Sequence, residues 1–315
     1  MALERGFMAA MECRPDFNMR VKADLLLLFV TILWGSAFAV MRFAAGHGTV
    51  FFLNGFRFLL GALTLLPFTK LGGAFSRKNL IYVGVAGLAL YGGVAFQQAG
   101  LATTTAGNGG FITSLYIVIV PFILWIFWRE KPSWQIGIAV VLAVTGGFLL
   151  STGGSFQVRP GDVFIFIGSF FWALHVIVVS RMQGRMKTLP FALGQFAVCG
   201  FLNLATGLFV ERPTQAEMLL VLPAIIYTGI FSIAIGFTLQ VVAQKYTPAN
   251  DAALIMSLES VFAVLFGWLF LHEMLIPIQI AGCALILVAV ILVQFSSYKN
   301  ASANNKINSE MVKSE

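Results

Sequence analysis

The chain has 315 residues, of which 59% are hydrophobic and only 10% are charged. Water-soluble domains carry about 25% charged residues, so this composition excludes an ordinary soluble protein. The net charge of +7 comes from basic residues that stand singly or in short groups between apolar runs. This spacing is typical of membrane topology signals and excludes a nucleic-acid-binding face, and no cofactor motif is present.

Polar segments are found at both ends of the chain. Residues 1–22 mix acids and bases and contain no apolar stretch of signal-peptide length, which predicts a short cytoplasmic tail. Residues 298–315 are polar and poor in aromatic side chains, as a disordered tail should be.

Ten apolar segments fill the chain between these ends. A membrane helix needs about 20 mostly apolar residues, and each segment approaches that length. The predicted spans are 24–42, 50–68, 79–99, 104–128, 134–151, 162–181, 190–210, 218–243, 249–271 and 277–297.

The basic residues orient these spans. With ten spans both ends lie on one side, and sixteen of the 20 Lys and Arg residues fall on that side. Only Arg42, Arg159 and Arg212 fall opposite, while Arg57 lies inside a span. Basic residues concentrate on the cytoplasmic side, so both termini are predicted to be cytoplasmic in an inner (plasma) membrane protein.

The two halves of the sequence repeat each other. At an offset of 138, Asp24 falls on Asp162 and Trp34 on Trp172. At an offset of 143, a longer block aligns, in which Gln97, Thr104, Asn108, Ser114, Leu115 and Glu130 fall on Gln240, Thr247, Asp251, Ser257, Leu258 and Glu273. Such self-similarity indicates a duplicated unit.

Each unit contains five spans, an odd number, so the copies must enter the membrane from opposite sides. The REK turn at 129–131 is predicted to be cytoplasmic, and its counterpart at 272–274, which lacks Lys and Arg, external. The predicted fold is therefore an all-α membrane protein of ten transmembrane helices, arranged as two inverted five-helix repeats over 23–152 and 160–297.

Three features resemble the EamA domains of the drug/metabolite transporter superfamily over roughly residues 22–297. They are the pair DLLLLFVTILWGSAFAVMR and DVFIFIGSFFWALHVIVVSR, the Arg57 in NGFRFLLGAL, and the pair TAGNGGFITSLYIVIVPFILWIFWRE and TPANDAALIMSLESVFAVLFGWLFLHE. The resemblance implies a central cavity lined by helices 1, 3, 4, 6, 8 and 9, with the last helix of each repeat at the back. One departure is Ser260, where the family often has a proline, which leaves a kink at that point open.

Polar or amphipathic side chains deep inside spans are the candidate site residues. Arg57, His175 and Glu259 are the ionisable ones, each costing about 2.5 to 3.5 kcal/mol at the bilayer centre on insertion scales. Because the resemblance places helix 2 away from the cavity, a structural role is favoured for Arg57, bonding carbonyls or snorkelling outward. For His175, cavity lining and plain helix packing are equally favoured. Trp34 and Trp172 lie far from the headgroup belts and are favoured as cavity lining over plain packing.

A phenol and a carboxyl occupy equivalent positions in the two repeats. Tyr116 corresponds to Glu259, which lies about ten residues into its span and therefore roughly 15 Å deep in a hydrocarbon core of about 30 Å. Glu259 is a candidate for substrate binding or proton coupling, against the alternative of a plain interhelical hydrogen bond. Asn108 and Asp251 are also equivalent but lie near helix starts, where capping is favoured.

The leading hypothesis is a secondary transporter that exports small metabolites, amino acids or drug-like compounds by alternating access. A membrane-embedded enzyme is the alternative, but His47, His175 and His272 have no metal-ligand spacing. A passive channel is a third hypothesis, but the sequence contains no ring of charges and no repeated filter motif that would support it. No phosphate loop for ATP occurs, and proton coupling and a homodimer are left open.

Overall fold

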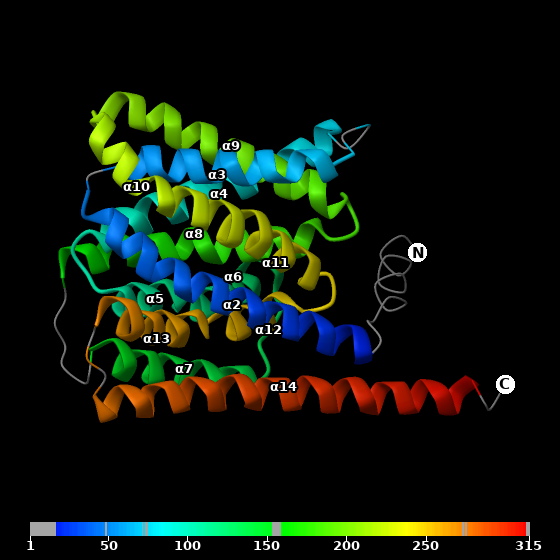
Figure 1. Cartoon of the computed structure of the whole chain (residues 1–315). Helices are drawn as coiled ribbons and strands as arrows, with labels where there is room; N and C mark the ends of the chain where they lie inside the picture. Colours follow the sequence, from blue (N-terminus) through cyan, green and yellow to red (C-terminus); the bar gives the residue numbers. More distant parts are fainter. Residues whose placement is uncertain are drawn as a thin grey trace.

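A computed structural model gives the arrangement of the chain. It describes residues 17–47, 49–70, 72, 75–152, 159–272, 274 and 276–312. Within these ranges the protein is helical and contains no strand, and the helices lie side by side as one bundle (Figure 1).

The first half of the chain contributes the helices up to residue 152. They are α2 (Phe17–Ala45), α3 (Val50–Leu65), the short 3-10 helix η1 (Leu66–Phe68), α4 (Arg77–Leu101), α5 (Ala106–Ser114), α6 (Tyr116–Trp128) and α7 (Trp134–Thr152).

The second half contributes the helices from residue 160 onward. They are α8 (Pro160–Met182), α9 (Thr188–Val210), α10 (Gln215–Tyr227), the π-helix η2 (Thr228–Phe237), α11 (Thr238–Ala243), α12 (Ala249–Met256), α13 (Glu259–Leu271) and α14 (Pro277–Val312).

The described helices include eight long and apolar stretches that could each cross a membrane. Four of these stretches join consecutive elements, namely α3 with η1, α5 with α6, α10 with η2 and α11, and α12 with α13. Two further apolar helices, Trp134–Leu150 and Pro277–Val293, are shorter. Every span predicted from the sequence coincides with one of these ten stretches, although the two shorter ones fall below the length of a typical crossing.

The outer surface of the bundle is apolar. Large side chains such as Phe127 and Phe209 are 73% and 84% exposed. In water such a surface would be penalised at roughly 25 cal/mol per Å², whereas lipid tails accept it without that cost. The composition of this surface is that of a protein surrounded by a bilayer.

Helix pairing crosses between the two halves. At the edges of the bundle α3 packs against α9, and α7 packs against α14 (Figure 1). In the interior α4 packs against α8, and α2 packs against α13, η2 and α11. The start of α2 and the end of α14 lie at one end of the bundle, whereas α8 begins at the opposite end (Figure 1).

Glycine allows the closest of these edge contacts. A Cβ atom added to Gly146 in α7 would collide with the carbonyl of Gly282 in α14, and one added to Gly282 would collide with the carbonyl of Gly146. Small residues at membrane helix interfaces let two backbones approach and gain dispersion contacts. The α7 and α14 backbones therefore touch directly at this point.

Two ends of elements differ from the sequence-based expectation. Residues 17–22, expected in the N-terminal tail, form the first turns of α2, and residues 1–16 lie outside the described part. Residues 298–312, expected to be disordered, continue α14 as a helix. Neither segment contains a helix-breaking proline or glycine within these helical bounds, so the backbone can extend the helix.

Candidate binding cavity

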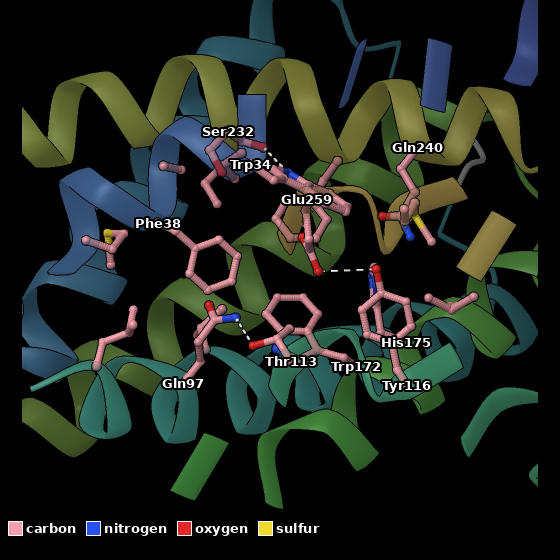
Figure 2. Close-up of a pocket in the computed structure, with 18 of the residues that line it drawn as sticks. Trp34, Phe38, Gln97, Thr113, Tyr116, Trp172, His175, Ser232, Gln240 and Glu259 are labelled. Carbon is pink, nitrogen blue, oxygen red and sulfur yellow. Dashed lines mark hydrogen bonds between the residues drawn. The ribbon is translucent and has the colours of Figure 1, made fainter. Parts of the chain in front are cut away.

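A cavity lies between helices of both halves and is lined by several buried polar groups (Figure 2). The six residues selected from the sequence all line it, namely Trp34, Arg57, Tyr116, Trp172, His175 and Glu259. Other polar contributors are Gln97, Thr113, Ser232 and Gln240. The structure therefore brings together the residues that were selected from the sequence.

Two interrupted helices form part of the cavity wall. The α5–α6 stretch breaks at Leu115, and the α12–α13 stretch breaks at Ser257 and Leu258, its repeat-related position. Just at these breaks the hydroxyl of Ser114 donates to the carbonyl of Phe111 at 2.8 Å, and that of Ser257 donates to Leu254 at 2.7 Å. Serine bonds of this kind draw backbone carbonyls out of line and bend helices. The second break forms with Ser260 in place of the family's frequent proline.

Tyr116 and Glu259 meet in the cavity because each is the first residue after a break. The Tyr116 hydroxyl donates to Oε1 of Glu259 at 3.2 Å, and the two residues are only 3% and 4% exposed. The phenol and the carboxyl of the two repeats therefore form a buried hydrogen bond between α6 and α13. This contact joins the halves at the residue pair that the sequence repeat singled out.

An aromatic wall lines the cavity, with Phe237 of η2 between the two tryptophans. The ring centroids of Trp34 and Phe237 are 4.7 Å apart, and those of Trp172 and Phe237 are 5.8 Å apart with the rings inclined by only 10°. Trp34 Nε1 donates to the carbonyl of Ser232 at 3.2 Å. Trp172 Nε1 is buried without a hydrogen-bond partner.

The π-helical geometry of η2 explains how Ser232 and Phe237 reach the cavity. A π-helix has wider turns than an α-helix and is frequent at functional sites. Its changed side-chain register brings both residues to the cavity wall. Sequence reasoning missed them, because the segment reads as an ordinary apolar helix.

His175 is held from one side only. Its Nε2 lies 2.9 Å from Oε1 of Gln195, so the ring donates from Nε2 to this amide oxygen. Its Nδ1 is buried and has no hydrogen-bond partner. His175 therefore borders the cavity as a fixed ring with one unused polar atom, and it is fully buried.

Arg57 lies where the sequence-based interpretation did not place it. It was expected away from the cavity, bonding carbonyls or snorkelling outward, yet it lines the cavity and is 4% exposed. Its Nε is buried without a partner, and its guanidinium carbon lies 5.4 Å from the centre of the Phe58 ring. The reason is packing, since Arg57 is among the buried residues of α3, a helix that packs against α9 and η2.

Gln97 and Gln240 are a repeat-related pair that sequence analysis aligned but did not select. Gln97 Nε2 donates to the hydroxyl of Thr113 at 2.9 Å, whereas Oε1 of Gln240 is buried without a partner. Both line the cavity. Their equivalence across the repeat, combined with a polar side chain deep in a span, was the signal that could have found them.

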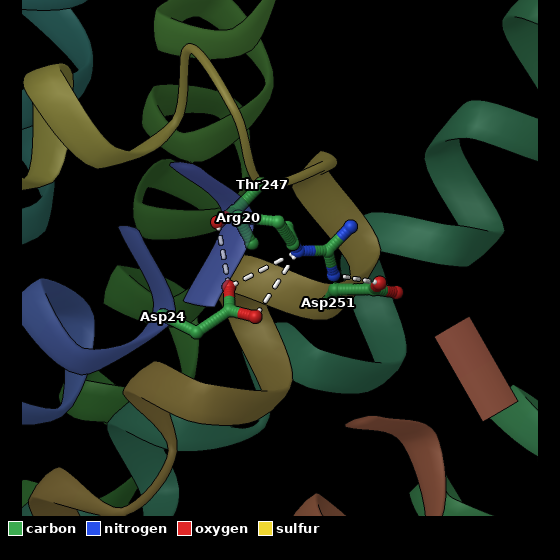
Figure 3. A network of polar contacts seen from close by, with 4 residues as sticks. All are labelled: Arg20, Asp24, Thr247 and Asp251. Atoms are coloured by element: carbon green, nitrogen blue, oxygen red, sulfur yellow. Dashed lines mark hydrogen bonds and ion pairs between the residues drawn. The ribbon is translucent and has the colours of Figure 1, made fainter. Parts of the chain in front are cut away.

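A charged cluster links α2 to α12 at the end of the bundle where α2 begins (Figure 3). The Arg20 guanidinium bonds Asp24 at 3.1 Å and Asp251 at 2.5 Å, and the Thr247 hydroxyl donates to Asp24 at 2.7 Å. These side chains are largely buried, at about a tenth exposed or less for the three ionic groups. Asp251 thus pairs with a cation and also lies in the first turn of α12, where a carboxylate is favoured.

A related cluster links α5 to α8. Nδ2 of Asn108 donates to Thr104 at 3.0 Å and to Asp162 at 2.7 Å, and the backbone N–H of Arg159 donates to Asp162 at 2.8 Å. Asn108 does not cap its helix as expected, because Thr105 does so. Thr104, Asn108 and Asp162 are the repeat counterparts of Thr247, Asp251 and Asp24.

Comparison with known proteins identifies the class of this bundle and cavity. A model of the EamA-like transporter family matches residues 21–152 and 159–295, so the chain belongs to that family. An uncharacterized transporter of Archaeoglobus fulgidus is 33% identical over 274 residues, covering 87% of this chain and 86% of the relative. The uncharacterized inner membrane transporter YedA of Escherichia coli (strain K12) is 27% identical over 281 residues, covering 86% and 90%.

The fold is also found in a solved crystal structure. It superposes with a TM-score of 0.71 at 17% identity, covering 89% of this chain and 98% of that chain. The chain is therefore a multi-pass membrane transporter of the EamA type, and its helical fold is the one seen in that structure.

Proposed function

We propose that the protein is a secondary transporter that exports small metabolites, amino acids or drug-like compounds across the inner membrane, binding them in the central cavity. The observation that carries this proposal is the Tyr116–Glu259 hydrogen bond inside the cavity, at two repeat-related helix breaks. Transporters commonly bind their substrates near the bilayer midplane, between repeats and beside discontinuous helices.

The ten helices are proposed to form two inverted repeats with cytoplasmic termini. Pairing supports this, because the α4–α8 contact has its counterpart in the contact of α2 with η2 and α11. Arg129 and His272, 143 positions apart, both end their helices in the left-handed conformation, at φ 59° and 54°. The opposite starting ends of α2 and α8 support the inversion (Figure 1).

Alternating access is proposed to operate through the two polar clusters. The Arg20 cluster holds α2 to α12, and the Asn108 cluster holds α5 to α8. In an inverted repeat these related clusters lie toward opposite membrane faces. Opening of one while the other stays formed would expose the cavity to one side at a time.

Glu259 is proposed to couple transport to protons. A carboxyl at 4% exposure pays a large desolvation cost when charged, so its protonation state depends on what occupies the cavity. Glu259 and Arg57 both line the cavity, but no ion pair joins them in the described part of the chain. The charge of an ionised Glu259 is therefore not compensated by Arg57. A group of this kind can take up and release a proton during each cycle.

Uptake of a labelled panel by proteoliposomes tests the proposed function. Purified full-length protein is reconstituted in both orientations, and amino acids, organic acids and drug-like compounds are offered with and without a pH gradient. The proposal expects saturable uptake of at least one class above that of empty liposomes, and it expects net export in oriented vesicles. Uptake indistinguishable from empty liposomes for every class would contradict it.

A further inference from the structure

Arg57 is the one strong cation of the cavity lining, and it has no partner of opposite charge within the part of the chain that the structure describes. The side chain is 4% exposed, and its Nε makes no hydrogen bond. Its identified neighbour is the ring of Phe58, 5.4 Å from the guanidinium carbon. A ring face attracts a cation but does not accept the five N–H groups of a guanidinium.

An unpaired guanidinium at this depth is costly. Taking a charge out of water costs several kcal/mol unless an opposite charge and hydrogen-bond acceptors replace the lost hydration. Arginine does not escape by losing its proton, because it stays charged in proteins. Glu259, the cavity's carboxyl, accepts instead from Tyr116 at 3.2 Å. Within the described part of the chain no carboxylate pairs with Arg57, so an acidic group that enters the cavity would meet an uncompensated cation.

Three further polar atoms of the cavity lining are also unused. Nε1 of Trp172, Nδ1 of His175 and Oε1 of Gln240 are buried without partners. The rest of the wall near them is aromatic, with Trp172 and Phe237 stacked 5.8 Å apart. A bidentate acceptor at Arg57 joined to an apolar body along the rings would satisfy the cation and fill the apolar wall together.

We propose that the cavity is specific for small organic compounds that carry a carboxylate, and that Arg57 receives this carboxylate. The inference rests on the proposed function, because it names the substrate class of the same cavity. A planar guanidinium presents a fork of N–H groups that matches the two oxygens of a carboxylate. A primary amide has the same shape but only one oxygen, so it cannot accept both N–H groups of the fork in this way.

Matched pairs of carboxylates and their primary amides test this inference by binding, without requiring transport. Benzoate and benzamide, phenylacetate and phenylacetamide, and indole-3-acetate and its amide are added to purified full-length protein in detergent. Binding is read by isothermal titration and by the shift of the unfolding midpoint. For wild type, at least one carboxylate should bind about tenfold or more tightly than its amide.

Arg57→Met should abolish the preference, because it keeps the volume of the side chain but removes the fork. Arg57→Lys should retain part of the carboxylate preference, since a point charge remains. The lysine variant provides the test if the methionine variant does not fold. Arg212→Met is the matched control, because Arg212 is exposed and bonds the carbonyls of Leu208 and Glu211.

The carboxylate preference surviving in Arg57→Met, or in Arg57→Lys at the full wild-type ratio, would overturn the inference. It would also be overturned if no carboxylate bound wild type better than its amide. Transport of neutral compounds by proteoliposomes, undiminished in these variants, would overturn the carboxylate assignment while leaving the transporter intact. Failure of the transporter proposal is a separate result, in which carboxylates bind in an Arg57-dependent way but no compound crosses the membrane.

Discussion

Replacement of Glu259 by Gln is the most informative perturbation of the cavity. The amide keeps the shape of the side chain and an oxygen that can accept from Tyr116, so a neutral hydrogen bond worth about 0.5 to 1.5 kcal/mol is retained. Glu259→Gln should therefore unfold within a few degrees of wild type. Glu259→Ala is different, because the Tyr116 hydroxyl, in a residue 3% exposed, loses its acceptor at a cost of about 1 to 3 kcal/mol.

The assay compares transport by these proteins as the pH changes. Proteoliposomes of wild type and Glu259→Gln are given the same internal buffer and a series of external pH values. Wild-type transport should follow the pH gradient, whereas the glutamine variant, which cannot titrate at this position, should transport at a rate that does not respond to it. Tyr116→Phe is the control, since it removes the 3.2 Å hydrogen bond and keeps the carboxyl. Wild-type rate and pH profile in Glu259→Gln would refute the reasoning and leave Glu259 as an interhelical contact.

Two other predictions concern topology and the aromatic wall. Single cysteines at Ser133 and Pro277, in a chain without native cysteines, should react with an impermeant thiol reagent from opposite sides of the membrane, and reaction from one side would exclude the inverted repeat. Trp34→Ala and Trp172→Ala should each weaken substrate binding by about tenfold, since aromatic contacts and buried area at the cavity are lost. Trp134→Ala, at a residue 70% exposed, should leave binding unchanged. Equal losses of affinity in all three variants would show that Trp34 and Trp172 serve helix packing and do not contact the substrate.

Much of the fold could be predicted because the bilayer imposes a simple rule on sequence. A span must be apolar for about 20 residues, so the ten stretches stand out, and the offsets of 138 and 143 align their interiors. Tyr116 and Glu259 were selected as equivalents at one depth, and their hydrogen bond follows from that symmetry. Polar and ionisable groups deep inside spans are rare, which is why several lining residues of the cavity could be selected from residue type and depth in the span.

The features that were missed depend on packing between helices. The π-helical turns of η2 and the helix breaks at Leu115 and Ser257 shift side-chain register, and apolar periodicity does not encode such shifts. Arg57 was assigned to the periphery because the family resemblance placed its helix there, whereas contacts with α9 and η2 enclose it beside the cavity. The end of α14 differs for another reason, since the polar composition of its last turns indicated disorder, whereas a segment without proline or glycine can continue the helix to Val312.

Solute counterflow tests the central claim of alternating access most directly. Proteoliposomes are loaded with an excess of an unlabelled compound that wild type takes up, diluted into trace labelled compound, and followed with time. A carrier that exposes one cavity to each side in turn should accumulate label transiently above equilibrium, and Glu259→Ala should lose this overshoot. A simple approach to equilibrium without overshoot, in wild type that transports the compound, would show a channel and contradict the account.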